Sequence, residues 1–228
     1  MPCLKIGHRG MRGYAKDNTI AGAMFAFVHG MDAVEIDIRK TTDNELILYH
    51  DKLIKTDTCE IPIDSLTYKE VKKYDDSIIS LYTFLKNIHI NKGKIFFDIK
   101  KCDNDLQFIK IFMDTIEFFI STGWDKELFY YQSYHASYIN TLSTYDNTFP
   151  NRGILYDGLP LNYFHDLQHV NATYICINWA SIDKTNITYI KNTTNLEIYI
   201  FTVNNKLVCE QFRHSVDGII TDYYNIFD

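Results

Sequence analysis

Two carboxylates interrupt the apolar stretch VEIDIRK, in which Glu35 and Asp37 alternate with aliphatic residues. Residues two apart in a β-strand point to the same face, so this spacing predicts both carboxylates on one side of a strand. Two buried carboxylates repel each other unless positive charge lies nearby. A divalent cation would supply that charge, and all-oxygen ligands favour Mg²⁺ or Ca²⁺ over zinc. The alternative is a salt bridge to Arg39 or Lys40.

A similar pattern occurs in IFFDIK, where Phe96, Asp98 and Lys100 share one face of a predicted strand. An acid and a base on one inward face can serve a metal ion and an anionic substrate together. The same two residues can also form a structural Asp–Lys pair, which the motif taken alone favours.

Two histidines each end a short apolar run, His8 in GHRG and His50 in YHD. Because the pKa of histidine lies near neutrality, one imidazole can accept a proton while the other donates one. Asp51 would either orient His50 or cap the following turn. Two histidines at predicted strand ends, together with three acids, indicate acid–base chemistry.

Arg9 adds a planar guanidinium group that can bind an oxyanion. Gly7 and Gly10, on either side of the HR pair, would let the backbone approach a ligand closely. A cation site, an arginine and Lys100 together imply an anionic substrate with a phosphoryl group.

Short β-rich runs alternate with amphipathic stretches along the chain, which predicts a parallel sheet with helical crossovers. About eight such units favour a closed (β/α)₈ barrel, with a doubly wound open sheet as the alternative. In a barrel, the acids and histidines would lie at the C-terminal ends of the strands, where barrel active sites are found. The predicted strands are Leu4–Gly7, Ala33–Ile38, Leu46–Tyr49, Lys94–Ile99, Leu128–Tyr131, Gly153–Leu155, Tyr174–Ile177, Ile198–Val203 and Gly218–Thr221. The predicted helices are Thr19–His29, Ser65–Lys73 (capped by Ser65 or Thr67), Ser80–Ile88, Asp105–Thr122, Ala136–Tyr145, Leu161–His169, Ile182–Asn192 and Asn205–His214.

The composition fits one globular domain, because 46% of the 228 residues are hydrophobic and 15% are aromatic. The net charge is −6 and no long run of Lys or Arg occurs, which argues against nucleic-acid binding. Five cysteines without a CxxC pair predict buried free thiols in a reducing compartment. No signal peptide or membrane-spanning window is evident, so we expect a cytoplasmic protein. The sequence indicates no oligomeric state.

An ordered set of motifs covering nearly the whole chain resembles the glycerophosphodiester phosphodiesterase family. GHRG and DNT, at 7–10 and 17–19, resemble HRG…PENT, and DAVEIDIRKTTDNELILYHD resembles the family block with paired acids and a final HD. Further along, IDSLTYKEVKKYD resembles the dLTxEEL stretch and FFDIK resembles IEiK. YYQSY, IFTVN and VDGIITDYY resemble the QSF-like, WTVN and DGIiTD segments.

The resemblance implies a (β/α)₈ barrel of the phospholipase C-like type, in a single domain over residues 1–228 without a large capping insertion. It implies metal-dependent hydrolysis of small phosphodiesters such as glycerophosphocholine and glycerophosphoethanolamine, giving an alcohol and glycerol 3-phosphate. The implied cofactor is one Mg²⁺ or Ca²⁺. The implied site residues are Glu35, Asp37 and Asp98 for the metal, His8 and His50 for acid–base catalysis, Arg9 and Lys100 for phosphate, and Asn18 and Phe201 for further substrate contacts.

Some positions depart from the family pattern. Asp98 replaces Glu, which shortens the reach to a metal by one methylene group and resembles sphingomyelinase D-type phospholipases. Phe201 replaces Trp and keeps an aromatic wall, while Asp17 replaces the Glu of PENT, so Asn18 is the position carried over there. The rival functions are a phospholipase D-like enzyme that forms a cyclic phosphate from lysophospholipids or sphingolipids, and an inactive barrel that binds a phosphorylated metabolite.

Overall fold

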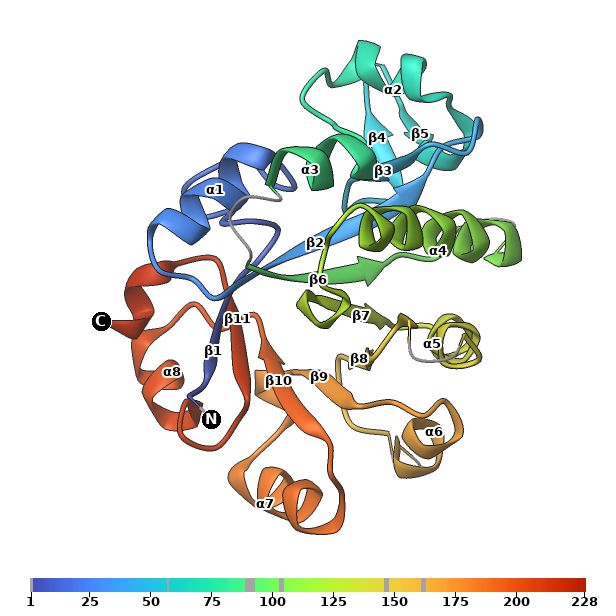
Figure 1. The fold of residues 1–228 in the computed structure, drawn as a ribbon. Helices are drawn as coiled ribbons and strands as arrows, with labels where there is room; N and C mark the ends of the chain where they lie inside the picture. Colours follow the sequence, from blue (N-terminus) through green and yellow to red (C-terminus); the bar gives the residue numbers. More distant parts are fainter. Residues whose placement is uncertain (1, 57, 89–92, 103–104, 146–147, 161–162) are drawn as a thin grey trace.

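Parallel strands close into a barrel surrounded by helices in this computed structural model, which describes residues 2–56, 58–88, 93–102, 105–145, 148–160 and 163–228 (Figure 1). The barrel strands are β1 (Leu4–Gly7), β2 (Ala33–Lys40), β6 (Lys94–Ile99), β7 (Phe129–Ser133), β8 (Asn151–Tyr156), β9 (Tyr174–Asn178), β10 (Glu197–Phe201) and β11 (Gly218–Thr221). Their order is β1-β11-β10-β9-β8-β7-β6-β2, and the pairing of β1 with β2 closes the ring. The (β/α)₈ prediction is therefore confirmed, and the open doubly wound sheet is excluded.

Helices cover the outside of the barrel, and all but the last of them lie between successive strands (Figure 1). They are α1 (Ile20–Val28), α3 (Leu81–Ile88), α4 (Asp105–Ser121), α5 (Ala136–Ser143), α6 (Tyr163–His169), α7 (Lys184–Thr193) and α8 (Lys206–Phe212), with the short 3₁₀ helices η3 (Lys126–Leu128), η5 (Trp179–Ser181) and η6 (Tyr224–Phe227). Leu161 and Asn162, where one helix was predicted to begin, lie outside the described residues. Across the described ranges, no helix is both long and apolar enough to cross a membrane.

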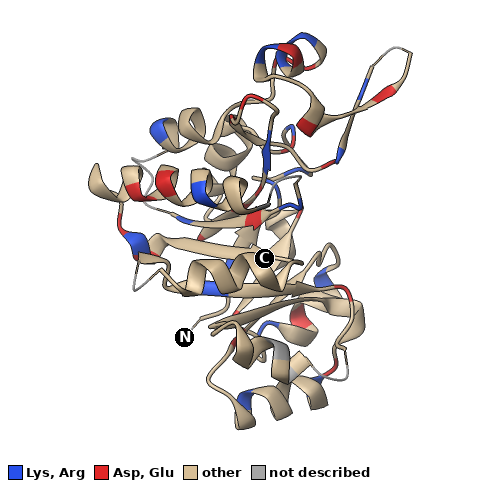
Figure 2. Ribbon diagram, turned by 90° about the vertical axis from the view of Figure 1, so that its right-hand side faces the viewer, with Lys and Arg blue, Asp and Glu red and all other residues tan. Residues whose placement is uncertain are grey.

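The connection from β2 to β6 contains a small substructure of its own. Its elements are β3 (Leu46–Leu48), β4 (Leu53–Lys55), β5 (Glu60–Pro62), η1 (Ile63–Ser65) and α2 (Tyr68–Tyr74). β3 pairs antiparallel with β2 and lies outside the parallel barrel, and β4 and β5 form a hairpin that extends from the barrel (Figure 2). This hairpin was not predicted, because three-residue strands carry too little periodicity to be recognised.

The start of α2 is decided by a capping box. The Thr67 hydroxyl accepts a hydrogen bond from the Glu70 backbone N–H, and the Glu70 carboxylate accepts one from the Thr67 backbone N–H. Of the two predicted caps, Thr67 is therefore the one used, and Ser65 belongs to η1.

Aromatic rings fill the interior of the barrel towards the N-terminal ends of its strands. They are Phe96 on β6, Tyr130 on β7, Tyr174 on β9 and Tyr199 on β10. Every pair of their ring centroids lies between 4.3 and 6.1 Å apart. Glycine makes room for these rings: a Cβ atom on Gly153 would lie 2.0 Å from the ring of Tyr174. The aromatic layer closes the barrel beneath the residues that could do chemistry.

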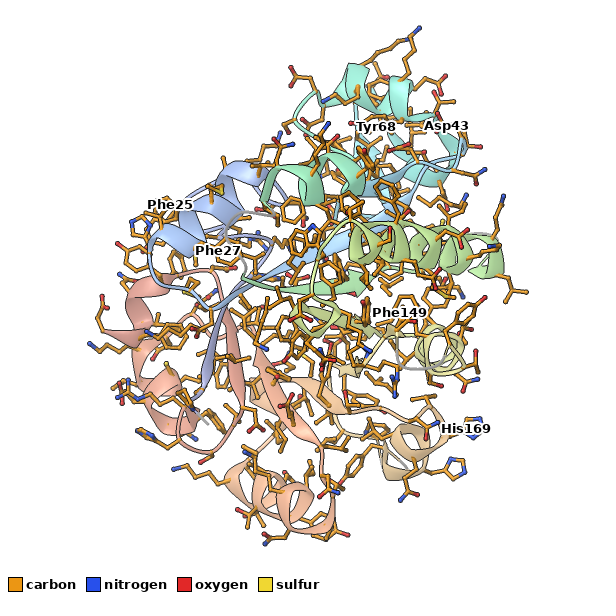
Figure 3. All side chains as sticks on the ribbon, viewed as in Figure 1. Phe25, Phe27, Asp43, Tyr68, Phe149 and His169 are labelled. Atoms are coloured by element: carbon orange, nitrogen blue, oxygen red, sulfur yellow. The ribbon has the colours of Figure 1, made fainter. Side chains whose placement is uncertain are left out.

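The opposite face of each strand packs against the helices. Val34, Ile36 and Ile38 on β2 belong to this outer core, as their spacing predicted. Phe149, labelled in Figure 3, packs with its ring centroid 5.1 Å from that of Tyr131 on β7. The apolar outer face thus holds the strands in place while the inner face is left for polar side chains.

We expect Gly153→Ala to lower the free energy of unfolding by about 1–3 kcal/mol, because the added methyl group would overlap the buried ring of Tyr174. Chemical denaturation of the purified protein would measure the change. The matched control is Gly158→Ala, whose Cβ would have its nearest neighbour at 3.9 Å. Equal effects of the two substitutions would show that the interior does not depend on this small residue.

Candidate active site

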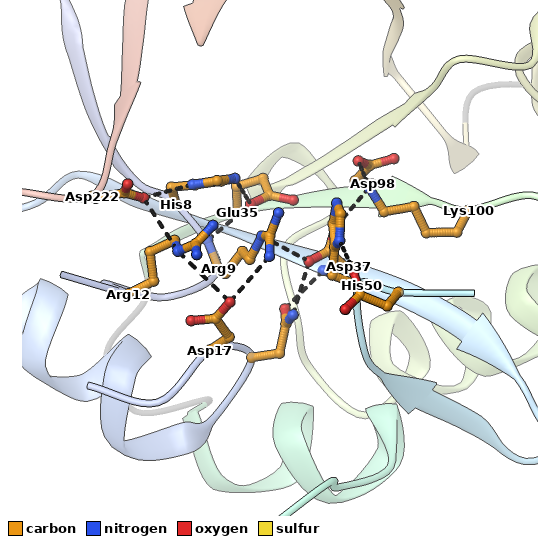
Figure 4. Close-up of polar contacts among 12 residues, drawn as sticks. His8, Arg9, Arg12, Asp17, Glu35, Asp37, His50, Asp98, Lys100 and Asp222 are labelled. Atoms are coloured by element: carbon orange, nitrogen blue, oxygen red, sulfur yellow. Dashed lines mark hydrogen bonds and ion pairs between the residues drawn. The ribbon is translucent and has the colours of Figure 1, made fainter. Parts of the chain in front are cut away.

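Three carboxylates converge near the C-terminal ends of two adjacent strands. Glu35 and Asp37 on β2 and Asp98 on β6 are only 3%, 1% and 6% exposed. Asp37 and Asp98 face each other in the register of the two strands. One oxygen from each residue lies within 4.8 Å of the others (Figure 4). The structure therefore brings together the three acids that two separate motifs singled out.

Lys100 supplies the positive charge between two of these acids. Its Nζ lies 2.9 Å from Asp37 Oδ1 and 2.5 Å from Asp98 Oδ2. The alternative prediction, a salt bridge from these acids to Arg39 or Lys40, is wrong. Within the described ranges neither side chain forms an ion pair with Glu35 or Asp37. Arg39 instead donates to backbone carbonyl groups, and Lys40 donates to the Thr41 carbonyl at 3.2 Å.

The pKa values of the ionisable groups in this cluster are shifted in different directions. Burial raises the pKa of Glu35, and the charges of Asp37 and Asp98 raise it further, well above the ordinary value of 4.5. Burial would also raise the pKa of Asp37, but Lys100 and other nearby cations lower it to about 2. For Lys100, burial would lower the pKa, and the surrounding carboxylates raise it above its ordinary value. Lys100 is therefore charged at neutral pH.

Asn18 and Arg9 hold these acids in position. Asn18 Nδ2 donates to Asp37 Oδ2 at 2.8 Å, and Asn18 Oδ1 accepts from the Asp37 backbone N–H at 2.9 Å. The Arg9 backbone N–H donates to Glu35 Oε2 at 2.9 Å, and its Nη1 donates to Asp17 Oδ2 at 3.1 Å. Both residues were predicted to bind substrate; the contacts of Asn18 are those of a residue that orients Asp37.

His8 lies immediately after β1 and is oriented by an acid from the other end of the chain. Its Nδ1 lies 2.7 Å from Asp222 Oδ1, and its Nε2 lies 3.9 Å from Glu35 Oε2. Asn204 donates to the other Asp222 oxygen at 2.6 Å. The sequence analysis missed Asp222, although it follows β11 as His8 follows β1, and this shared position was the available signal.

His50 is oriented by its own neighbour, which is one of the two roles considered for Asp51. His50 Nδ1 lies 2.7 Å from Asp51 Oδ1. Arg39 Nε and Nη2 both donate to the His50 carbonyl oxygen, at 2.9 and 2.7 Å, and so fix the backbone at this residue. Burial lowers the pKa of His50, and the nearby Asp37 partly opposes that shift.

The glycines beside His8 have a steric role within the loop after β1. A Cβ atom on Gly7 would lie 1.9 Å from the carbonyl oxygen of Gly10. Gly10 has φ +90°, a conformation that glycine adopts readily. The two glycines therefore let the loop after β1 fold back on itself.

These side chains surround a cavity of about 160 Å³. Its lining residues are His8, Arg9, Glu35, Asp37, His50, Asp98, Lys100, Gln132, Tyr134, Leu155, Phe201, Thr202 and Ile220. Phe201, Leu155 and Ile220 form an apolar wall opposite the charged groups. Gln132 is a second residue that the sequence analysis missed: it is buried on β7, and its Oε1 has no partner in the described part of the chain. The cavity thus joins a charged side to an apolar side.

The profile of the glycerophosphoryl diester phosphodiesterase family matches residues 8–226. The chain belongs to this family. It is 26% identical over 238 residues to YhdW of Bacillus subtilis (strain 168), which is provisionally named a glycerophosphodiester phosphodiesterase; the match covers 96% of this chain and 93% of the relative. The sequence resemblance and the enzyme class predicted from it are therefore confirmed.

Solved structures of other phosphodiesterases share the fold. One is a phosphodiesterase of Oleispira antarctica in complex with the product sn-glycerol-3-phosphate, with a TM-score of 0.86 and 20% identity over 99% of this chain and 96% of that one. Another is a glycerophosphodiester phosphodiesterase of Thermotoga maritima, with a TM-score of 0.76 and 19% identity over 100% of this chain and 97% of that one.

The acidic cluster of this family member could bind a metal ion. All three side chains offer oxygen, the ligand type that hard divalent cations prefer. Asp98 Oδ1 is buried and has no hydrogen-bond partner among the described residues, so it is available as a ligand. Three carboxylates face two cationic side chains, Lys100 and Arg9, which leaves room for further positive charge.

We expect Glu35→Gln to stabilise the chelator-treated phosphodiesterase at pH 7, because the neutral amide does not carry the negative charge that burial and the neighbouring acids disfavour. The folded state raises the pKa of Glu35, so its ionised carboxylate weakens folding above the unfolded-state pKa. The gain should vanish below the ordinary value of 4.5, where both states are protonated. Denaturation at several pH values, with Glu117→Gln on the exposed face of α4 as control, would test this; a loss of stability at pH 7 would contradict it.

Proposed function

We propose that this family member hydrolyses glycerophosphodiesters to an alcohol and glycerol 3-phosphate. The observation that carries the proposal is the pairing of two Asp-oriented imidazoles with a buried carboxylate–lysine cluster in one cavity. Such a cavity offers both proton transfer and charge stabilisation to a phosphoryl group.

The charged side of the cavity would bind the phosphate. We propose Glu35, Asp37 and Asp98 as the ligands of one divalent cation, Mg²⁺ or Ca²⁺, which would withdraw negative charge from the phosphoryl oxygens when bound. Lys100 adds a fixed positive charge at the same place, because its ammonium group is held by two carboxylates. Arg9 lines the cavity and contributes a second cation.

The two histidines would divide the proton transfers. One imidazole removes the proton from the attacking hydroxyl, and the other gives a proton to the leaving alcohol oxygen. Asp222 and Asp51 bind Nδ1 of their respective histidines, which leaves Nε2 of each ring for these transfers. The attacking group is water or the glycerol 2-hydroxyl, and the second choice would give a cyclic phosphate first.

A phospholipase D-like reaction is the second candidate, and the Asp at position 98 favours it, since the family pattern has Glu there. A lyase of this type would release a cyclic phosphate from lysophosphatidylcholine, which phosphorus NMR would detect. Tight binding of glycerophosphodiesters without turnover would instead support the inactive binding barrel.

We expect His8→Ala and His50→Ala each to lower kcat by about 10²–10⁴-fold, because each variant lacks one of the two proton-transfer groups. Release of glycerol 3-phosphate from a panel of glycerophosphodiesters would measure this. His214→Ala, at an exposed position after α8, is the matched control and should retain wild-type turnover. Wild-type-like kcat in either site variant would exclude that histidine from the reaction.

Chelation should abolish turnover if the acidic cluster needs a cation. EDTA is expected to remove activity, and Mg²⁺ or Ca²⁺ added in excess should restore it. Assaying the same substrate panel with each cation in turn would identify the preferred metal. Unchanged rates in EDTA would show that the three carboxylates act without a metal ion.

A further inference from the structure

A second cavity, of about 340 Å³, adjoins the proposed reaction centre. Asp98, Lys100 and Tyr134 line both cavities, so the two cavities share part of their walls at the carboxylate cluster. The volume falls in the range of small-molecule sites. The other lining residues are Arg39, Lys52, Asp64, Ile99, Lys101, Cys102 and His135.

This second cavity is positively charged although the whole chain has a net charge of −6. Arg39, Lys52 and Lys101 line it, and among the described residues none of the three forms an ion pair with a carboxylate. Apart from Asp98, which is bound to Lys100, its acidic lining residue is Asp64. The cavity therefore has more positive than negative side chains.

Arg39 is the fixed member of this group. Its guanidinium donates twice to the His50 carbonyl and, through Nη1 at 3.2 Å, to the Lys101 carbonyl. These three hydrogen bonds leave two of its five N–H donors for another acceptor. Arg39 is half-buried, so its charged group is partly removed from water. A half-buried cation without a carboxylate partner gains most from a bound anion.

We propose that this second cavity binds the headgroup of the substrate and selects headgroups that carry an anionic group, a phosphate or a carboxylate. The inference rests on the proposed function, because it places the scissile phosphate at the carboxylate cluster. A phosphodiester has two arms. The smaller cavity, with Phe201 in its wall, suits the constant glycerol arm, and the larger charged cavity suits the arm that varies.

Choline and ethanolamine fit this cavity less well. Both are cationic, and each of the three positive side chains would repel them. Tyr134 presents an aromatic ring, but one exposed cation–π contact is a weak interaction. Repulsion from a single unit charge at 4 Å is about as large even in bulk water. Three cations therefore outweigh one ring and the single carboxylate of Asp64.

The test compares three substrates that release the same glycerol 3-phosphate: glycerophosphocholine, glycerophosphoinositol and glycerophosphoinositol 4-phosphate. We expect wild-type kcat/KM to be highest for the 4-phosphate and lowest for the choline ester. The double variant Lys52→Gln/Lys101→Gln should lower kcat/KM for the 4-phosphate by about five- to twenty-fold, as two partly exposed ion pairs would. The value for glycerophosphocholine should stay the same or rise, and added salt should weaken the wild-type preference.

Lys69→Gln/Lys86→Gln is the matched control, since it removes the same charge from exposed positions on α2 and α3 that do not line the cavity. It should leave the substrate preference unchanged. Failure of the wild type to cleave any of the three esters would overturn the proposed function itself. Cleavage of all three without a preference for the 4-phosphate, or equal losses on all three in Lys52→Gln/Lys101→Gln, would overturn the headgroup inference and leave the phosphodiesterase proposal standing.

Discussion

Compensation of buried negative charge is the constraint on which this site depends. Three carboxylates lie close together inside the barrel, two on β2 and one near the C-terminal end of β6, and each is almost fully removed from water. Lys100 lies between Asp37 and Asp98 because it follows Asp98 by two positions and so shares its inward face. Asn18 and the Arg9 backbone satisfy further carboxylate oxygens. The remaining negative charge is what makes the cluster attractive to a cation.

The two ends of the barrel interior differ: one is packed with aromatic rings, and the other holds the carboxylate cluster. Aromatic rings pack the interior beneath the site, and glycines such as Gly153 leave the space that these rings need. A tightly packed floor gives the strands little freedom to shift, so the carboxylates above keep their spacing. The carboxylates can then lie close together without unfolding the barrel, because the stability of the barrel comes mainly from the apolar layers.

Much of this arrangement could be predicted from period-two patterns. The alternation in VEIDI and FFDIK correctly separates the inward acids from the outward aliphatic residues, since it depends only on local strand geometry. The partner of Asp37 could not be predicted, because Lys100 becomes its neighbour only when β2 and β6 pair. Arg39 shares the inward face with Asp37 but is directed to the His50 carbonyl by a loop whose path no pattern reveals.

Other features of the structure could not be predicted from the sequence for related reasons. Asp222 is one of many acids in the chain, and its contact with His8 requires β1 and β11 to lie side by side. The hairpin of β4 and β5 is too short to show a period, although the segments on either side of it supply Lys52 and Asp64 to the second cavity. Cys59 is exposed, so the expectation of buried thiols holds for Cys102, Cys176 and Cys209 and not for every cysteine.

β1 pairs with both β2 and β11, so the first strand to be synthesised gains its second neighbour only when the last strand is in place. His8 and Asp222, which are 214 positions apart, can meet only after that final strand has emerged from the ribosome. Until then, a growing polypeptide has an open sheet and an unoriented imidazole. The contact between His8 and Asp222 therefore forms in one late step, and a polypeptide that ends before β11 would lack it.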